Sequence, residues 1–120
     1  MRILVIDDES VFLNTLITRL ELRGQEAKGC SDARTGLDLL NSEKFDVVLI
    51  DIKMPGIDGI EALQMVKAQQ PDLPVILLTG HACAETAGKG KQKGAYDYLL
   101  KPFPMDDLVD KIEEAIKQKP

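Results

Sequence analysis

Histidine, cysteine and aromatic residues are scarce in this 120-residue chain, which has one histidine, two cysteines and no tryptophan. The cysteines, Cys30 and Cys83, are too few and too scattered for a disulfide framework or a four-ligand zinc site, so we expect both to be reduced. The single histidine, His81, falls in a predicted loop, which favours a solvated side chain over a catalytic base.

Long apolar runs and an excess of positive charge are also absent. No apolar stretch approaches the roughly 20 residues that a helix needs to cross a bilayer. The N-terminal segment MRILVIDDES ends in acids, which is not the pattern of a signal peptide. The formal net charge of -5 disfavours binding to a nucleic-acid backbone. We therefore expect a cytoplasmic protein that contacts neither membranes nor nucleic acid directly.

The length predicts one domain, 1–120, with a single core, and leaves open whether it stands alone or was cut from a longer protein. Along the chain, short continuous apolar runs alternate with apolar residues at helical spacing. Strands are expected at 2–7, 26–30, 45–51, 74–79 and 95–100, and helices at 12–20, 33–41, 105–117 and from the Asp58 cap to Gln69. Buried strands that alternate with helices predict a doubly wound α/β fold, a parallel sheet with helices on both faces.

Acidic, hydroxyl and amino side chains follow the predicted strands at their carboxyl ends, where parallel α/β sheets bind ligands. They are Asp7 and Asp8 after the first strand, Asp51 after the third, Thr79 after the fourth and Lys101 after the fifth. Three neighbouring carboxylates need a cation, and oxygen-only ligands favour Mg²⁺. A carboxylate can also become an acyl phosphate, and Asp51 is the best candidate nucleophile because its strand is expected to be central.

Four motifs, IDDE at 6–9, LIDIKMPGIDG at 49–59, LLTG at 77–80 and YLLKPF at 98–103, stand in order at the predicted strand ends. Together they resemble the receiver domain of two-component response regulators, over essentially the full chain. The resemblance implies a flavodoxin-like (βα)5 fold, similar to that of chemotaxis regulators, with a five-stranded parallel sheet in the order 2-1-3-4-5.

The resemblance also implies the chemistry of the acidic edge. Asp51 would be the aspartate that a histidine kinase phosphorylates. Asp8 and Asp51 would bind Mg²⁺ directly, with help from the backbone carbonyl of Lys53, while Asp7 would act mainly through water. Lys53 and His81 match positions whose side chains tune the dephosphorylation rate.

Four further roles follow from the resemblance. Thr79 and Tyr98 match the pair that reorients when the phosphoryl group arrives. Lys101 matches the salt-bridge partner of that group, and the peptide bond before Pro102 is expected to be cis. The domain would catalyse only its own phosphorylation and dephosphorylation and would not be an enzyme in any wider sense.

The implied partners are a histidine kinase or phosphotransfer protein, and an output domain or downstream protein. They would meet the face made by the fourth helix, fifth strand and fifth helix, where a dimer on activation is left open. The fourth helix looks weak, because 84–93 has only three alanines to bury and contains Gly88 and Gly90, which each cost about 1 kcal/mol relative to alanine. We expect 82–94 to be short, irregular or mobile before phosphorylation and more ordered after it.

Two other functions share parts of this pattern. A phosphohydrolase of the haloacid-dehalogenase type also uses an aspartyl phosphate, but it would place a D-x-D motif where this chain has adjacent Asp7 and Asp8. A flavin-binding module of similar topology would need hydroxyls and glycines where this chain has IDDESV.

Overall fold

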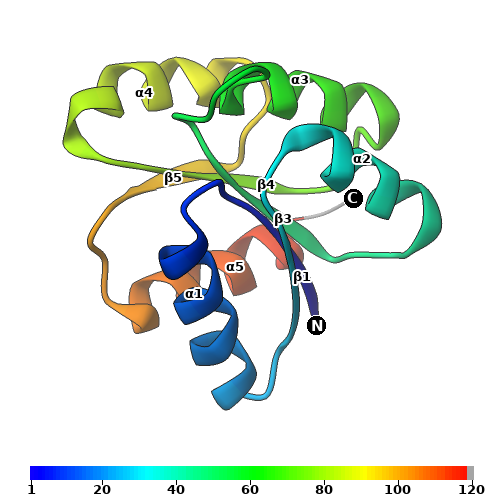
Figure 1. Ribbon diagram of the computed structural model, residues 1–120, viewed down its shortest axis with the longest axis vertical. Helices are drawn as coiled ribbons and strands as arrows, with labels where there is room; N and C mark the ends of the chain where they lie inside the picture. The colour runs from blue at the N-terminus through cyan, green and yellow to red at the C-terminus, as the bar shows by residue number, and fades with distance from the viewer. Residues whose placement is uncertain (119–120) are drawn as a thin grey trace.

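The computed structural model describes residues 1–118, apart from the side chain of His81 (Figure 1). Strands and helices alternate from end to end. The strands are β1 Arg2–Ile6, β2 Glu26–Cys30, β3 Val47–Asp51, β4 Val75–Thr79 and β5 Asp97–Leu100. The helices are α1 Ser10–Leu22, α2 Ala33–Ser42, α3 Gly59–Gln69, α4 Ala84–Gln92 and α5 Met105–Lys117, with a 3-10 turn, η1, at His81–Cys83.

All neighbouring strands pair in parallel, in the order β2-β1-β3-β4-β5. This confirms the predicted doubly wound, flavodoxin-like fold and its strand order. The predicted elements differ from the observed ones only at their ends; β5, for example, begins at Asp97, two residues later than expected. Figure 1 shows α1 and α5 on one face of the sheet and α2, α3 and α4 on the other.

The sheet separates two apolar clusters, one under each helical layer. Along β1, Leu4 and Ile6 pack into the cluster beneath α2, α3 and α4, while Ile3 and Val5 pack into the cluster beneath α1 and α5. All four side chains are fully buried. Because successive side chains of a strand point to opposite faces, a strand covered on both sides must be continuously apolar.

Two helices begin at aspartate caps. The Asp58 carboxylate accepts a hydrogen bond from the N–H of Glu61 at 2.9 Å, which confirms the predicted start of α3. The Asp32 carboxylate accepts one from the N–H of Thr35 at 2.8 Å, a cap for α2 that the sequence analysis did not identify. Within residues 1–118, no helix has the length and apolar character required to cross a membrane.

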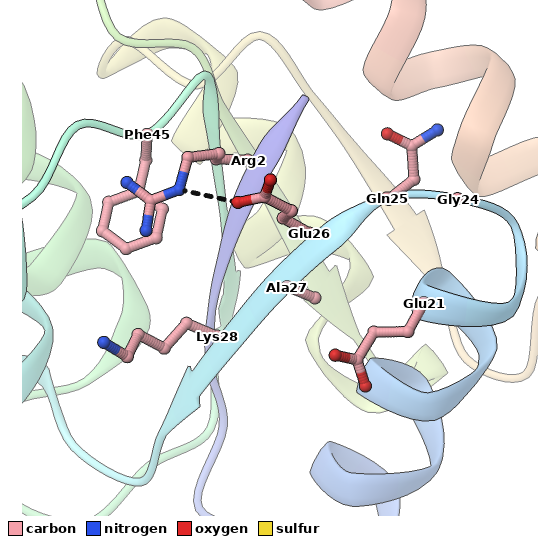
Figure 2. Close-up of a pocket in the computed structure, with 8 residues that line it drawn as sticks. All are labelled: Arg2, Glu21, Gly24, Gln25, Glu26, Ala27, Lys28 and Phe45. Carbon is pink, nitrogen blue, oxygen red and sulfur yellow. Dashed lines mark ion pairs between the residues drawn. The ribbon is translucent and has the colours of Figure 1, made fainter.

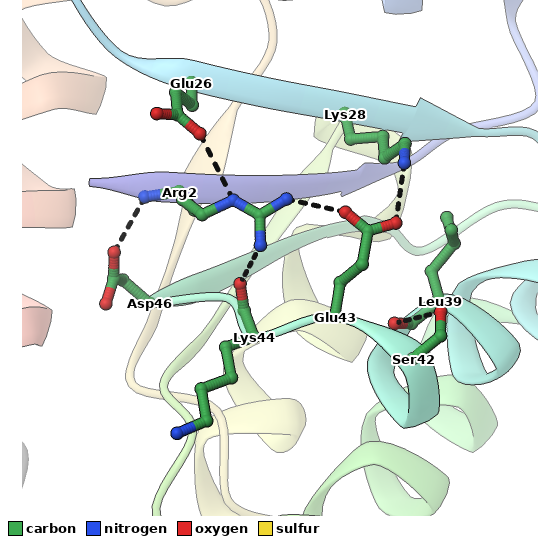
Figure 3. Close-up of polar contacts among 8 residues, drawn as sticks. All are labelled: Arg2, Glu26, Lys28, Leu39, Ser42, Glu43, Lys44 and Asp46. Carbon is green, nitrogen blue, oxygen red and sulfur yellow. Dashed lines mark hydrogen bonds and ion pairs between the residues drawn. The ribbon is translucent and has the colours of Figure 1, made fainter.

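At the end of the sheet where the strands begin, Arg2 links neighbouring segments through hydrogen bonds and ion pairs (Figure 3). Its main-chain N–H donates to the Asp46 carboxylate at 2.7 Å. Its guanidinium donates to the carbonyl oxygen of Lys44 and to the Glu43 carboxylate, both at 2.6 Å. Glu43 also accepts from Nζ of Lys28 at 2.6 Å. One side chain therefore joins β1 to the segment that leads into β3, and Glu43 extends the link to β2.

A hollow of about 510 Å³ lies beside this network (Figure 2). The guanidinium carbon of Arg2 lies 4.9 Å from the centroid of the Phe45 ring, and its Nε lies 3.2 Å from the Glu26 carboxylate. Both cations that line the hollow, Arg2 and Lys28, are thus already paired with carboxylates. This pairing favours a structural role for the end of the sheet that holds Arg2.

The fourth helix bears on the expectation that 82–94 is short, irregular or mobile. α4 is short, with nine residues, but it is a regular helix, and Ala87 and Gly90 are its buried positions. A methyl group at Gly90 would collide with Cδ1 of Leu77, whereas one at Gly88 would meet open space. Gly90 is therefore needed for the close approach of α4 to β4, a role that helix propensity could not reveal. The change in order on phosphorylation stays a prediction.

The two glycines of α4 should respond to alanine in opposite ways. Gly88→Ala should stabilise the protein by about 0.5–1 kcal/mol, because alanine favours a helix and nothing obstructs its methyl group. Gly90→Ala should destabilise it by about 1–2 kcal/mol, because Leu77 is fully buried and has little room to move. Urea unfolding of both variants measures the difference, and equal shifts would contradict the close contact.

Candidate functional site

The ends of four strands deliver the predicted site residues to one edge of the sheet. Asp51 and Thr79 are the last residues of β3 and β4, and Asp7 and Lys101 directly follow β1 and β5. Backbone hydrogen bonds continue past the strand ends: the N–H of Asp7 donates to Cys30 at 3.1 Å, and that of Lys101 donates to Thr79 at 2.7 Å. The main chain that carries these side chains is therefore held by the sheet itself.

Three carboxylates meet at this edge. Asp7, Asp8 and Asp51 each offer an oxygen, and the three oxygens lie within 4.8 Å of one another. Asp7 is fully buried, Asp51 is 5% exposed, and Asp8 is exposed. An all-oxygen set that is open on one side fits Mg²⁺, which keeps several waters and takes few protein ligands. The convergence expected from the sequence is thus present in the fold.

Lys101 is the cation of this cluster, and its side chain is 16% exposed. Its Nζ donates a hydrogen bond to the Asp7 carboxylate at 3.0 Å. The same nitrogen lies 3.6 Å from an oxygen of Asp51 and 3.5 Å from one of Glu9. Lys101 therefore hydrogen-bonds to the fully buried acid and stands just beyond hydrogen-bond distance of Asp51.

An aromatic ring completes the surroundings of Lys101. Its Nζ lies 3.9 Å from the centroid of the Phe12 ring, within cation–π distance. Phe12 in turn meets Phe103 edge to face, with centroids 6.3 Å apart and planes at 85°. Neither Phe12 nor Glu9 was predicted as a site residue. Glu9 belongs to the IDDE motif at the end of β1, whereas Phe12 reaches Lys101 only because α1 packs beside the end of β5.

Burial and charge shift the pKa values of the central pair. Burial, followed by the charge of Asp7, raises the pKa of Asp51 to about 6, although Lys101 acts in the opposite direction. Burial alone would lower the pKa of Lys101, but the hydrogen bond and charge of Asp7, with Asp51 and Glu9, raise it above its ordinary value. Without a metal, the ionised form of Asp51 is therefore less favourable in the fold than in the unfolded chain, while Lys101 stays charged.

The loop after Asp51 depends on two glycines. Gly56 has φ +75°, a conformation that a side chain disfavours. The N–H of Gly59 donates to the carbonyl oxygen of Ile52 at 2.8 Å. A Cβ at Gly59 would collide with the carbonyl oxygen of Asp51 and lie 2.5 Å from Cα of Ile52. These are main-chain atoms, which cannot rotate away, so the position of Asp51 requires glycine at 59.

An open cleft of about 710 Å³ lies over the carboxylates and gives access to them. Lys53, from the loop after β3, lines it as predicted for a residue near Asp51. The other residues that line the cleft are Asp8, Glu9, Asp51, Met54, Pro55, Gly80, Ala82, Cys83 and Lys101. The cleft is therefore walled by the loops that follow β1, β3, β4 and β5.

The remaining predicted residues lie at different depths. Thr79 is 1% exposed, and its hydroxyl donates to the carbonyl oxygen of Gly80 at 3.2 Å. Tyr98 is half-buried and packs against the cluster beneath α2, α3 and α4. The peptide bond before Pro102 is cis, as expected. The backbone of His81 is in η1, but its side chain lies outside the described part of the chain.

The raised pKa of Asp51 predicts a pH-dependent stability. Between about pH 4 and 6 the folded protein binds more protons at Asp51 than the unfolded chain does, so stability falls as pH rises through this window. Without Mg²⁺, Asp51→Asn should therefore be about 1–2 kcal/mol more stable than the unsubstituted protein at pH 7, and the advantage should shrink towards pH 4. Urea unfolding in EDTA measures it, and a constant or inverted difference would contradict the shift.

A sequence model of the response regulator receiver domain family matches residues 3–113. Regulatory protein AtoC of Escherichia coli (strain K12) is 40% identical over 116 residues, which are 97% of this chain and 25% of AtoC. Transcriptional regulatory protein FixJ of Bradyrhizobium diazoefficiens is also 40% identical over 116 residues, which are 57% of FixJ. The chain thus spans between a quarter and about half of the length of these relatives.

Solved structures agree with the sequence relatives. The receiver domain of NtrX from Brucella abortus superposes with a TM-score of 0.92 at 36% identity, covering 97% of this chain and 98% of that one. A response regulator receiver domain protein from Clostridium thermocellum gives 0.92 at 39% identity, covering 98% and 95%. With the family match over most of its length and an acidic cleft at the carboxyl ends of its strands, this chain belongs to the response regulator receiver domains, the phosphorylation-controlled switches of two-component systems.

Proposed function

We propose that Asp51 is the phosphoacceptor of this receiver domain. The observation that carries the proposal is its position: an almost fully buried carboxylate at the base of the open cleft, with two further carboxylates and the Lys101 ammonium around it. A nucleophile so placed is reachable by a phosphodonor and shielded from most of the solvent.

In the proposed reaction, a carboxylate oxygen of Asp51 attacks the phosphorus of a phosphohistidine on a kinase or phosphotransfer protein. An O–P bond forms as the P–N bond breaks, and the electron pair of that bond leaves with the imidazole. Water later attacks the phosphorus, which returns the carboxylate and releases inorganic phosphate. The domain thus catalyses only its own phosphorylation and dephosphorylation.

The metal in this proposal is Mg²⁺. Asp8 and Asp51 would hold it directly, together with the backbone carbonyl of Lys53, and Asp7 would act through water. When bound, Mg²⁺ supplies positive charge for the oxygens of the phosphoryl group. Before phosphorylation, Asp7 accepts the hydrogen bond that orients Lys101.

The other side chains would respond to the phosphoryl group and set the rate of its hydrolysis. Lys101 would pair with the phosphoryl group and Thr79 would donate a hydrogen bond to it, for which its hydroxyl must leave the carbonyl of Gly80. Tyr98 would reorient with Thr79 and alter the face of α4, β5 and α5. Lys53 and His81 would tune the rate at which water reaches the phosphoryl group.

The partners follow from this chemistry. A histidine kinase or phosphotransfer protein would supply the phosphoryl group, and an output domain or downstream protein would respond to the altered face of α4, β5 and α5. The greater length of AtoC and FixJ supports an output domain in the whole protein. A dimer formed through the same face on activation is a further proposal.

Asp51 should be the only residue that acetyl phosphate modifies. With Mg²⁺, intact-mass spectrometry should show one added phosphoryl group on the unsubstituted protein and on Asp38→Asn, a control at an exposed carboxylate of α2. Asp51→Asn, or chelation of Mg²⁺ with EDTA, should remove the labelling. Equal labelling of Asp51→Asn would contradict the assignment.

Gly59→Ala should slow phosphorylation by about tenfold to a hundredfold, because its methyl group must displace the main chain that carries Asp51. Gly88→Ala is the matched control, since its methyl group meets open space far along the chain from this loop. Rates with acetyl phosphate are compared at a temperature where both variants are folded. If Gly59→Ala reacts at the same rate as Gly88→Ala, the predicted collision between the new methyl group and the Asp51 main chain is wrong.

A further inference from the structure

The ammonium of Lys101 has two kinds of neighbour, acids and an aromatic ring. Three carboxylates, those of Asp7, Glu9 and Asp51, lie within 3.6 Å of its nitrogen, and the centroid of the Phe12 ring lies at 3.9 Å. We propose that Phe12 is a positioning residue for phosphorylation, whose ring face holds the Lys101 ammonium within reach of both Asp7 and Asp51. The inference rests on the proposed role of Asp51 and deepens it.

The ring suits a cation that has to change its partner. In the structure Lys101 is hydrogen-bonded to Asp7, and a phosphoryl group on Asp51 would require the ammonium to turn towards new oxygens. A hydrogen bond must break for such a turn, because it depends on direction. Attraction to a ring face depends mainly on the distance to the centroid, so it persists while the N–H groups exchange acceptors.

Phe12 is itself held in place. It lies in the first turn of α1, is half-buried and packs against the cluster beneath α1 and α5. Phe103, two residues after Lys101, contacts it edge to face. The ring thus bridges the start of α1 and the segment after β5, the two segments that also carry Glu9 and Lys101.

Without the ring, the Lys101 ammonium would lose its contact with Phe12, and its side chain would populate more rotamers. A lysine side chain has many rotamers, and each that carries Nζ away from Asp51 reduces the population competent for phosphorylation. Phe12 acts only through Lys101 in this account, because its ring offers no ligand to a metal and no group to the phosphodonor. Its substitution should therefore change the phosphorylation rate more than the affinity for Mg²⁺.

The kinetic test uses two variants. Phe12→Leu keeps an apolar side chain but removes the ring, and Phe12→Tyr keeps the ring. Phe12→Leu should react with acetyl phosphate about three- to tenfold more slowly, the range expected for loss of one partly desolvated cation–π contact. Phe12→Tyr should recover most of the rate. Phe45→Leu is the matched control, because it removes the ring under Arg2 at the other end of the sheet.

The spectroscopic test observes Lys101 directly. In ¹H–¹³C spectra of protein labelled with ¹³C-lysine, protons above a ring face resonate upfield of those of other lysines. The Lys101 side-chain signal, assigned by its loss in Lys101→Arg, should be shifted upfield in the unsubstituted protein and in Phe12→Tyr, and should move to the ordinary position in Phe12→Leu. A purely structural role for Phe12 would lower stability without producing this pattern.

The outcomes separate this inference from the function on which it rests. A slow Phe12→Leu with recovery in Phe12→Tyr, together with the upfield Lys101 signal, supports the positioning role. An ordinary Lys101 signal in the unsubstituted protein, or a Phe12→Leu rate equal to that of Phe45→Leu, overturns it while leaving Asp51 as phosphoacceptor. Failure of the unsubstituted protein to be labelled at Asp51 would overturn the proposed function instead, and the Lys101 signal would still decide whether the ring holds the ammonium.

Discussion

The hydrogen bond between the Lys101 ammonium and the fully buried Asp7 carboxylate is the interaction on which the site depends. A carboxylate with no exposed surface is costly unless a cation or hydrogen-bond donors replace its water. Asp7 has both, since Lys101 donates to one oxygen and the N–H of Glu9 donates to the other at 2.9 Å. With Asp7 satisfied, the remaining negative charge is concentrated on Asp8 and Asp51, next to the cleft where a divalent cation can reach it.

The pairing of the strands brings this cluster together. Parallel pairing aligns the carboxyl ends of β1, β3, β4 and β5, so residues that are distant in sequence reach one edge of the sheet. The opposite end of the sheet shows the contrast. There Arg2, Lys28 and their acidic partners neutralise each other, so that end is closed by internal pairing while the other end is left with unbalanced charge.

The apolar runs followed by acids are local signals, and they were sufficient for the alternation of strands and helices and for the residues at the edge of the sheet. The strand order came only from the resemblance to receiver domains, because no local pattern says which strands are neighbours. The sequence also ranked the receiver domain above a phosphohydrolase or a flavin module, and the family match agrees. Three features were beyond it. Any scale of helix propensity counts Gly90 against a helix. Glycine is needed there because a larger residue would collide with the side chain of Leu77 on β4. Gly59 belonged to a recognised motif, but its collision with the Asp51 main chain is a property of the folded loop. Phe12 reads as an ordinary core residue until α1 is placed beside Lys101.

The contact between Asp7 and Lys101 spans 94 positions of the sequence, and this separation has a consequence for how the protein is made. Contacts between distant residues form late, because the intervening chain must lose its freedom before they are gained. A chain still emerging from the ribosome, or one clipped before β5, has its aspartates but lacks the cation that orients them. The acidic site is therefore complete only when the whole sheet has formed, because a fragment that ends before β5 carries the three aspartates without the Lys101 ammonium that satisfies Asp7.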